Sequence, residues 1–94
     1  MPDDRAQRIA DLLHEAGEIH HGYFADTGGA DDDWATFYSD WLLAHSKLPE
    51  LLGRRPVRSH LTRDLVVCDE DYTAQVRGEP WPRWYAAKLI EKYG

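Results

Sequence analysis

Hydrophobic residues recur at steps of three and four along most of the chain, and this spacing is typical of amphipathic helices. The first helix is expected to run from Asp3 or Asp4 to about His21, with Gly22 as its stop. The second is expected to open at the acidic run 31–33, where an aspartate can cap the free N–H groups of a first turn. The two apolar stripes comprise Ile9, Leu12, Leu13, Ala16, Ile19, His20 and Tyr23, and then Trp34, Phe37, Tyr38, Trp41, Ala44, His45 and Leu48.

The same period predicts two helices in the second half of the chain. One is expected from the stretch 56–59 to about Arg77, and the other from about Pro82 almost to Gly94. Pro49 ends the preceding helix or starts a short turn that Gly53 closes. No stretch alternates cleanly in steps of two. The sequence therefore predicts an all-α fold, a single domain over 1–94 built as a small helical bundle of about four helices with short connections. The expected apolar faces of the last two helices are Leu61, Leu65, Cys68, Tyr72 and Val76, and Tyr85, Ala86, Leu89, Ile90 and Tyr93.

The composition of the chain indicates the class of protein and the cellular compartment. The chain has 94 residues, of which 43% are hydrophobic and 30% charged, so it has the composition of a globular protein. Its one cysteine, Cys68, allows no disulfide within the chain, and the N-terminus lacks the apolar segment of a signal peptide. The longest strongly apolar run, residues 65–68, is far too short to cross a membrane. A cytoplasmic protein without a membrane partner is expected.

The charge is uneven along the chain. Residues 1–40 contain ten acids and only two bases, whereas residues 41–94 contain seven acids and nine bases, within a net charge of −6. Binding to a phosphate backbone needs a basic footprint, so nucleic acid is not expected as a partner. The acidic half is expected either to face something basic, including the other half of the chain, or to be an ordinary solvated surface.

Three side chains on the first helix could bind a metal ion. His14, Glu18 and His21 fall at positions i, i+4 and i+7, and imidazole with carboxylate suits zinc or another transition ion. This face lies opposite the apolar stripe, so a solvated polar face is the competing interpretation. No cofactor is expected on any recognisable motif.

Two histidines fall instead on apolar stripes. His20 and His45, among aromatic residues that include Trp34 and Trp41, would line a pocket inside the bundle if both side chains pointed inward. A histidine in such a stripe is more often a core residue whose ring is hydrogen-bonded. His60 and Asp64, one turn apart on the third helix, are expected on an exposed charged surface.

A basic segment precedes and opens the third helix. Arg54, Arg55 and Arg58 lie close in sequence to Ser59, with Arg63 one turn further on. Free N–H groups at a helix start and arginine forks both favour an anion, so these residues are a candidate phosphate or carboxylate site. The alternative is that the arginines pair with the acidic N-terminal half.

The segment 80–85 is rich in aromatic residues. Trp81 and Trp84, three residues apart, flank Arg83, and this residue mix is common in interface hot spots. The alternative is that the two tryptophans clamp the end of the bundle.

No signature of a catalytic or nucleotide-binding site occurs in the chain. Cys68 lies in the middle of an apolar stripe, which favours a buried small residue over a nucleophile. The first hypothesis is therefore a non-enzymatic helical protein that associates with itself or with another protein. The second is a domain that binds a small molecule, an anion or a metal ion, with or without catalysis.

Overall fold

The computed structural model describes residues 4–24, 33–75 and 78–93, and within these ranges all regular structure is α-helical. The all-α prediction is confirmed. The described part of the chain contains five helices, one more than expected, because the turn after Pro49 forms a short helix of its own. The helices are α1 (Asp4–Tyr23), α2 (Trp34–His45), α3 (Leu48–Leu52), α4 (Arg58–Gln75) and α5 (Trp81–Tyr93).

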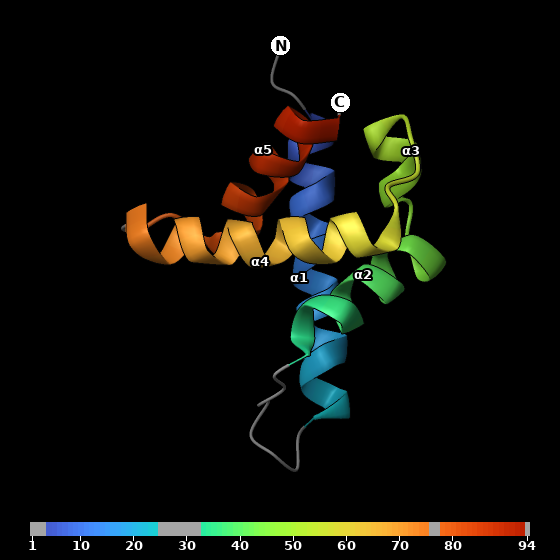
Figure 1. Cartoon of the computed structure of the whole chain (residues 1–94), viewed down its shortest axis with the longest axis horizontal. Coiled ribbons are helices and arrows are strands. Elements are labelled where there is room, and N and C mark those ends of the chain that lie inside the picture. The colour runs from blue at the N-terminus through green and yellow to red at the C-terminus, as the bar shows by residue number, and fades with distance from the viewer. Residues whose placement is uncertain (1–3, 25–32, 76–77, 94) are drawn as a thin grey trace.

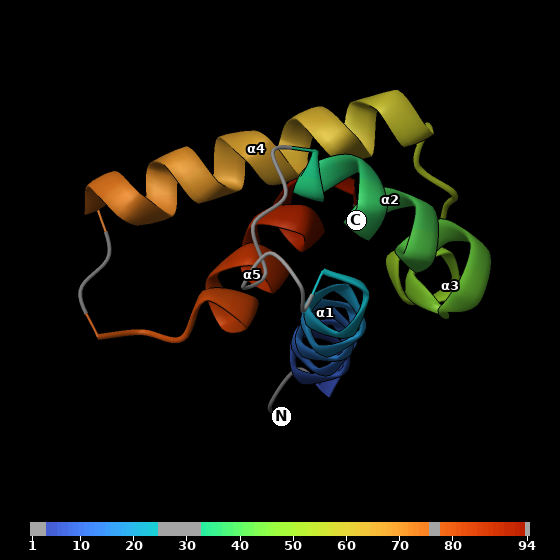
Figure 2. The ribbon, with the colours of Figure 1, turned by 90° about the horizontal axis from the view of Figure 1, so that it is seen from below.

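The helices form a crossed bundle (Figure 1). α1 and α5 pack side by side, and α1 begins at the end of the bundle where α5 finishes. α4 runs across the other helices, and Figure 2 shows α2 and α5 lying between it and α1. Contacts between α2 and α4 and between α4 and α5 hold this layer together.

The core is aliphatic, with a few aromatic and polar side chains at its edges. The expected faces of the first, third and last helices are largely buried, with Tyr23 as the main exception at 77% exposure. The core residues are Ile9, Ala10, Leu13, Ala16, Ala35, Leu42, Leu43, Leu48, Leu52, Leu61, Leu65, Cys68, Tyr85, Ala86, Leu89 and Tyr93.

The stripe expected for α2 is only partly correct, because Trp34, Tyr38 and Trp41 pack against the core while remaining half-buried. Its buried residues are Ala35, Ser39, Leu42 and Leu43, whereas His45 is exposed. The small Ser39 lies against α4: its hydroxyl donates to the Ala35 carbonyl at 2.8 Å, and the Thr62 hydroxyl lies 2.8 Å from it. A buried serine satisfied in this way lets two helices approach closely, and a hydrophobicity pattern gives it no weight.

The start of α2 also differs from the expected cap. The Asp33 side chain makes no capping bond to the backbone and accepts a hydrogen bond from the Thr36 hydroxyl at 2.8 Å. Asp31 and Asp32 lie outside the described residues, as do Val76 and Arg77 at the expected end of the third helix.

The short helix α3 closes one side of the bundle. Pro49 occupies its first turn, where no N–H partner is needed, and Gly53 ends it with φ of 77°. The Gly53 N–H donates to the Glu50 carbonyl. Leu48 and Leu52 are buried against α1 and α5, so the turn contributes to the core.

Candidate functional site

The proposed metal ligands of α1 do not form a ligand set. His14 Nε2 lies 2.9 Å from Glu18 Oε1, and both side chains are well exposed. The two residues and His21 border a hollow of about 390 Å³ beside Tyr38 and Trp81. Across the described residues, no group of three or more histidine, cysteine, aspartate or glutamate side chains is placed to hold a metal ion. The arrangement is that of a helix-surface pair.

The two histidines of the predicted pocket lie in different environments. His20 is 7% exposed and stacks on Phe24, with ring centroids 4.7 Å apart, and its ring contacts Phe37 and Tyr38. His45 is exposed at the last residue of α2. The half-buried Trp34 and Trp41, two turns apart on α2, line two different hollows. The pattern misplaced His45 because it assigned the wrong face of α2 to the core.

The arginines near the start of α4 mostly attach it to α2. Arg55 donates to the Leu43 carbonyl at 3.1 Å, and Arg58 donates to Asp40 at 2.9 Å, an interaction that raises the pKa of the guanidinium. The Arg58 pair joins the basic segment to the acidic half of the chain, as the alternative interpretation expected. Arg54 and Ser59 are exposed.

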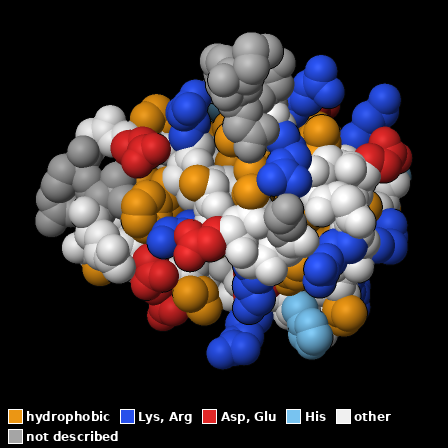
Figure 3. All heavy atoms as spheres, turned by 90° about the horizontal axis from the view of Figure 1, so that it is seen from above, with side chains coloured by type: hydrophobic (Ala, Val, Ile, Leu, Met, Phe, Trp, Pro, Cys, Tyr) orange, Lys and Arg blue, Asp and Glu red, His pale blue; other side chains and the backbone are white. Residues whose placement is uncertain are grey.

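Figure 3 views the bundle from the end that carries α3, the start of α1 and the end of α5. On this face the Lys and Arg side chains stand apart from one another, interspersed with acidic and apolar ones. The basic residues visible there do not merge into one continuous patch.

The aromatic segment at the start of α5 is a joint between helices. Trp81 is half-buried, with its ring 6.1 Å from that of Tyr38. Trp81 also lies beside Gly17 of α1, where a side-chain carbon would make an ordinary contact with its ring at 3.5 Å. Arg83 donates to the Gln7 side chain at 2.6 Å, which ties α5 to α1. Lys88 Nζ lies 4.7 Å from the Trp84 ring centroid, over a ring that is itself half-buried.

Two tyrosine hydroxyls are tied to carboxylates of α4. Tyr93 donates to Asp64, whose other oxygen lies 3.0 Å from Lys92 Nζ. Asp64 is buried, and the expectation that it would be exposed is wrong. Tyr85 donates to Asp69 at 3.0 Å. Burial, and after it these hydrogen bonds, raises the pKa of both phenols, so they stay neutral.

Cys68 has the properties of a core residue. It is buried on α4, and burial is the main cause that raises the pKa of its thiol to about 11. A thiol with a raised pKa supplies little thiolate at neutral pH. This environment disfavours a nucleophilic role.

An apolar concavity lies between α1 and α2, and two of the four residues predicted to line a pocket, Trp41 and His45, are among those that line it. This groove has a volume of about 630 Å³. Its side chains come from two rows, one on each helix, and several of them had been assigned to the core by the periodicity. The lining residues are Glu15, Ile19 and Tyr23 of α1 and Phe37, Asp40, Trp41, Ala44 and His45 of α2.

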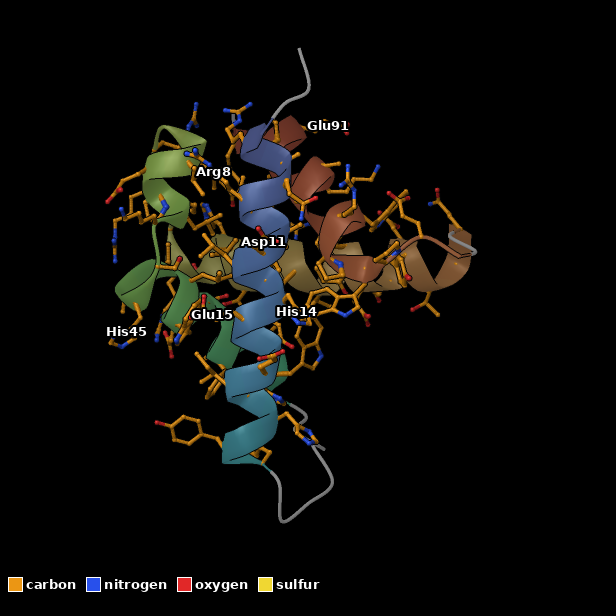
Figure 4. The ribbon with its side chains drawn as sticks, turned by 180° about the vertical axis from the view of Figure 1, so that it is seen from behind. Arg8, Asp11, His14, Glu15, His45 and Glu91 are labelled. Atoms are coloured by element: carbon orange, nitrogen blue, oxygen red, sulfur yellow. The ribbon has the colours of Figure 1, made fainter. Side chains whose placement is uncertain are left out.

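The two rows follow helical spacing. Glu15, Ile19 and Tyr23 are four residues apart, which aligns them along one side of α1. At one end, the Tyr23 ring contacts the Phe37 ring edge-on, with centroids 5.6 Å apart. Figure 4 shows Glu15 on the side of α1 that faces His45, while His14 lies on the other side. We call this surface the α1–α2 groove.

Carboxylates border an otherwise apolar floor in the α1–α2 groove. Glu15 is exposed on the α1 wall, and Asp40 on the α2 wall is held by Arg58. Tyr23, with 77% of its surface exposed, is the most exposed large hydrophobic residue among those described. The surface thus combines solvent-facing apolar rings with a negative rim.

Among the described residues, no helix combines the length and the apolar character needed to cross a membrane. Comparison of the chain with protein-family models, curated proteins and solved structures gives no match.

Proposed function

We propose that this protein is a small non-enzymatic binding module, and that its α1–α2 groove receives an amphipathic helix of a partner protein. The observation that carries the proposal is the pair of side-chain rows that leaves Tyr23, Phe37 and Trp41 lining an open groove. Exposed apolar concavities with a polar rim are typical of protein-interaction surfaces.

The spacing of the two rows supports a helical occupant. Side chains four residues apart form ridges on a helix, and the groove between two such ridges accepts the ridge of a third helix. The α1 row from Glu15 to Tyr23 extends about 12 Å along the helix axis, or roughly two turns. A partner helix with apolar residues at i, i+3, i+4 and i+7 presents anchors over the same length.

Charge supports a basic flank on that helix. Glu15 and Asp40 border the groove on opposite walls, within a chain whose net charge is −6. Asp40 is already bound by Arg58, so lysine or arginine beside the apolar anchors would meet Glu15 above all and accelerate association. The same charge disfavours nucleic acid as the partner.

The rest of the proposal follows from the described chemistry. No catalytic set accompanies the groove among the residues described, so we assign the protein a binding role and not an enzymatic one. Its single cysteine suits the reducing cytoplasm, where we place it.

The test uses two synthetic helical peptides that share leucine anchors at i, i+3, i+4 and i+7. One peptide carries lysine at the flanking positions and the other carries glutamate. Each is titrated into isotope-labelled protein, and the amide shifts are followed by NMR. We expect the lysine peptide to bind more tightly and to shift resonances of α1 and α2 around Tyr23 and Trp41.

Two variants assign the binding to the groove. Tyr23→Ser removes an exposed ring at its end, and Val67→Ser removes a 41% exposed residue of α4 far from it in the sequence. We expect Tyr23→Ser to weaken binding of the lysine peptide by about tenfold or more, as an anchor does, and Val67→Ser to leave it unchanged. Failure of both peptides to bind would contradict the proposal. A protein dimer that Tyr23→Ser dissociates would also contradict it, because a second copy would then fill the groove.

A further inference from the structure

A second concavity lies where α2, α4 and α5 meet, and five aromatic residues and one carboxylate line it. Its volume is about 340 Å³, near the lower end for sites that bind small molecules. We propose that this aromatic hollow binds a methylated ammonium group, carried by a free small molecule or by a side chain of a peptide. The residues that carry the argument are Trp34, Tyr38, Asp69, Tyr72, Trp81 and Tyr85.

The rings form a connected wall around the hollow. Each contacts the next, and each plane is turned steeply against its neighbour, as in the sides of a cage and unlike a flat stack. In order around the wall, the centroid distances and interplanar angles are 5.5 Å and 86° for Trp34–Tyr38, 6.1 Å and 57° for Tyr38–Trp81, 5.0 Å and 67° for Trp81–Tyr85, and 6.3 Å and 74° for Tyr85–Tyr72.

Three helices hold this wall in place. Trp34 is the first residue of α2, Tyr72 lies near the end of α4 and Trp81 is the first residue of α5. The Tyr72 hydroxyl donates to the Glu79 carbonyl, which attaches the end of α4 to the segment before α5. The four rings other than Tyr85 are half-buried, so each is packed on one side and accessible on another.

Asp69 carries the negative charge among these six residues. Its Oδ1 accepts the Tyr85 hydrogen bond at 3.0 Å, and the residue is exposed. Burial raises the pKa of Tyr38 and Tyr85, so both phenols keep their protons at neutral pH. The hollow therefore combines a carboxylate with aromatic rings whose faces carry negative potential, and both attract a cation.

The chemistry selects a methylated ammonium over other ligands. An anion would be repelled by the carboxylate, and a neutral apolar group would gain nothing from it. A primary ammonium loses strong hydration on entering an aromatic site, whereas methyl groups spread the charge and pack against rings.

Two groups of probes separate the sources of the cation. The first compares choline with 3,3-dimethylbutanol, in which carbon replaces the charged nitrogen, at matched ionic strength. The second compares a short peptide that contains trimethyllysine with the same peptide containing lysine. Binding is followed by isothermal calorimetry and by NMR of the tryptophan indole N–H groups. We expect choline to bind in preference to its neutral analogue, and the methylated peptide in preference to the unmodified one if the source is a protein.

Matched variants assign the binding to the hollow. Trp34→Ala removes a half-buried ring at the start of α2, and Asp69→Asn removes the charge while it keeps an acceptor for Tyr85. We expect each to weaken choline binding by about 3- to 30-fold, the range for a cation–π or charge contact. Glu70→Gln, the neighbouring exposed carboxylate of α4, should leave binding unchanged. Circular dichroism of each variant establishes that it is folded.

Three results would overturn the inference. They are equal binding of choline and its neutral analogue, no saturable binding of choline or the methylated peptide at millimolar concentration, and binding that both variants leave unchanged. Tyr23→Ser, which lies outside the hollow, should not alter choline binding. Failure of the aromatic hollow is therefore distinguishable from failure of the α1–α2 groove.

Discussion

The packing between α4 and α5 differs from the packing between α1 and α2 in how far large side chains are buried. Between α4 and α5, Leu65 and Leu89 are buried, and the Tyr93 hydroxyl is bound to Asp64. Between α1 and α2, the rings of Tyr23 and Trp41 line an open groove. Around Leu65 and Tyr93 the first pair of helices encloses its apolar and polar groups together, whereas along the groove the second pair leaves apolar rings facing solvent.

This difference separates stability from binding. A domain of this size buries a modest fraction of its surface, so the contribution of each enclosed leucine is large relative to the total. Rings left in an open groove contribute less to folding, and a partner can still bury them. We therefore expect substitutions at the α4–α5 joint to change the free energy of unfolding and substitutions in the groove to change association.

The largest effect is expected at Leu65, which has no solvent exposure. Leu65→Ala should lower the free energy of unfolding by about 2–5 kcal/mol, because it removes buried surface and leaves a cavity. Tyr23→Ala should change the same quantity by less than about 0.5 kcal/mol, as exposed positions usually do. Urea denaturation followed by circular dichroism measures both, and equal losses would remove the distinction between the two regions.

A smaller loss is expected at Asp64. Asp64→Ala should lower the free energy of unfolding by about 1–3 kcal/mol, because the Tyr93 hydroxyl would remain buried without its acceptor. The double variant with Tyr93→Phe should lose less than the sum of the two single variants, since both remove the same hydrogen bond. Strict additivity in this cycle would mean that the two side chains do not interact.

Two glycines of α1, one beside Tyr38 and one facing open space, allow a matched comparison of packing. A side-chain carbon at Gly17 would lie 3.0 Å from the Tyr38 hydroxyl, whereas one at Gly22 would meet nothing within 4 Å. Gly17→Val should lower the free energy of unfolding by about 1–3 kcal/mol through overpacking. Gly22→Val should have little effect. Similar thermal unfolding midpoints for the two variants would contradict the close approach of α1 to Tyr38.

Alkaline pH should weaken the α4–α5 joint gradually. Below about pH 9 the Cys68 thiol keeps its proton in both folded and unfolded chains, so its contribution to stability is complete. As the pH rises toward about 11, the unfolded chain releases this proton first, and stability is lost. Tyr85 and Tyr93, whose pKa values are also raised, act in the same direction at higher pH. Denaturation midpoints measured from neutral to alkaline pH should fall, and Cys68→Ala should reduce the early part of the fall; a flat profile would contradict the burial of these groups.

Periodicity predicted most of the fold and little of the binding surface. The faces of α4 and α5 were readable because Leu61, Leu65 and Leu89 repeat at helical spacing and are buried. The buried face of α2 could not be predicted in this way, because the residue that lets α2 pack on α4 is Ser39. Its polar side chain is buried and hydrogen-bonded to the Ala35 carbonyl. Hydrophobicity assigned the larger aromatic residues of α2 to the core in its place.

The surroundings of the candidate site residues were harder to predict, for a related reason. His45 was placed inward by the same error, whereas Arg58 needed a partner 18 residues away, Asp40, that no local pattern reveals. The α1–α2 groove depends on how two helices cross, which spacing along each helix does not determine. The aromatic hollow likewise gathers residues from three helices.

The central claim is that the negative rim of the α1–α2 groove selects a basic helix, and a charge reversal tests it most directly. The measurement is the affinity of Glu15→Lys for the lysine-flanked and glutamate-flanked peptides, with Glu70→Lys on α4 as the matched control. The account predicts that Glu15→Lys weakens binding of the lysine peptide and strengthens binding of the glutamate peptide. Glu70→Lys should leave the affinity for both peptides unchanged. Equal changes for both variants, or an unchanged preference in Glu15→Lys, would contradict the claim.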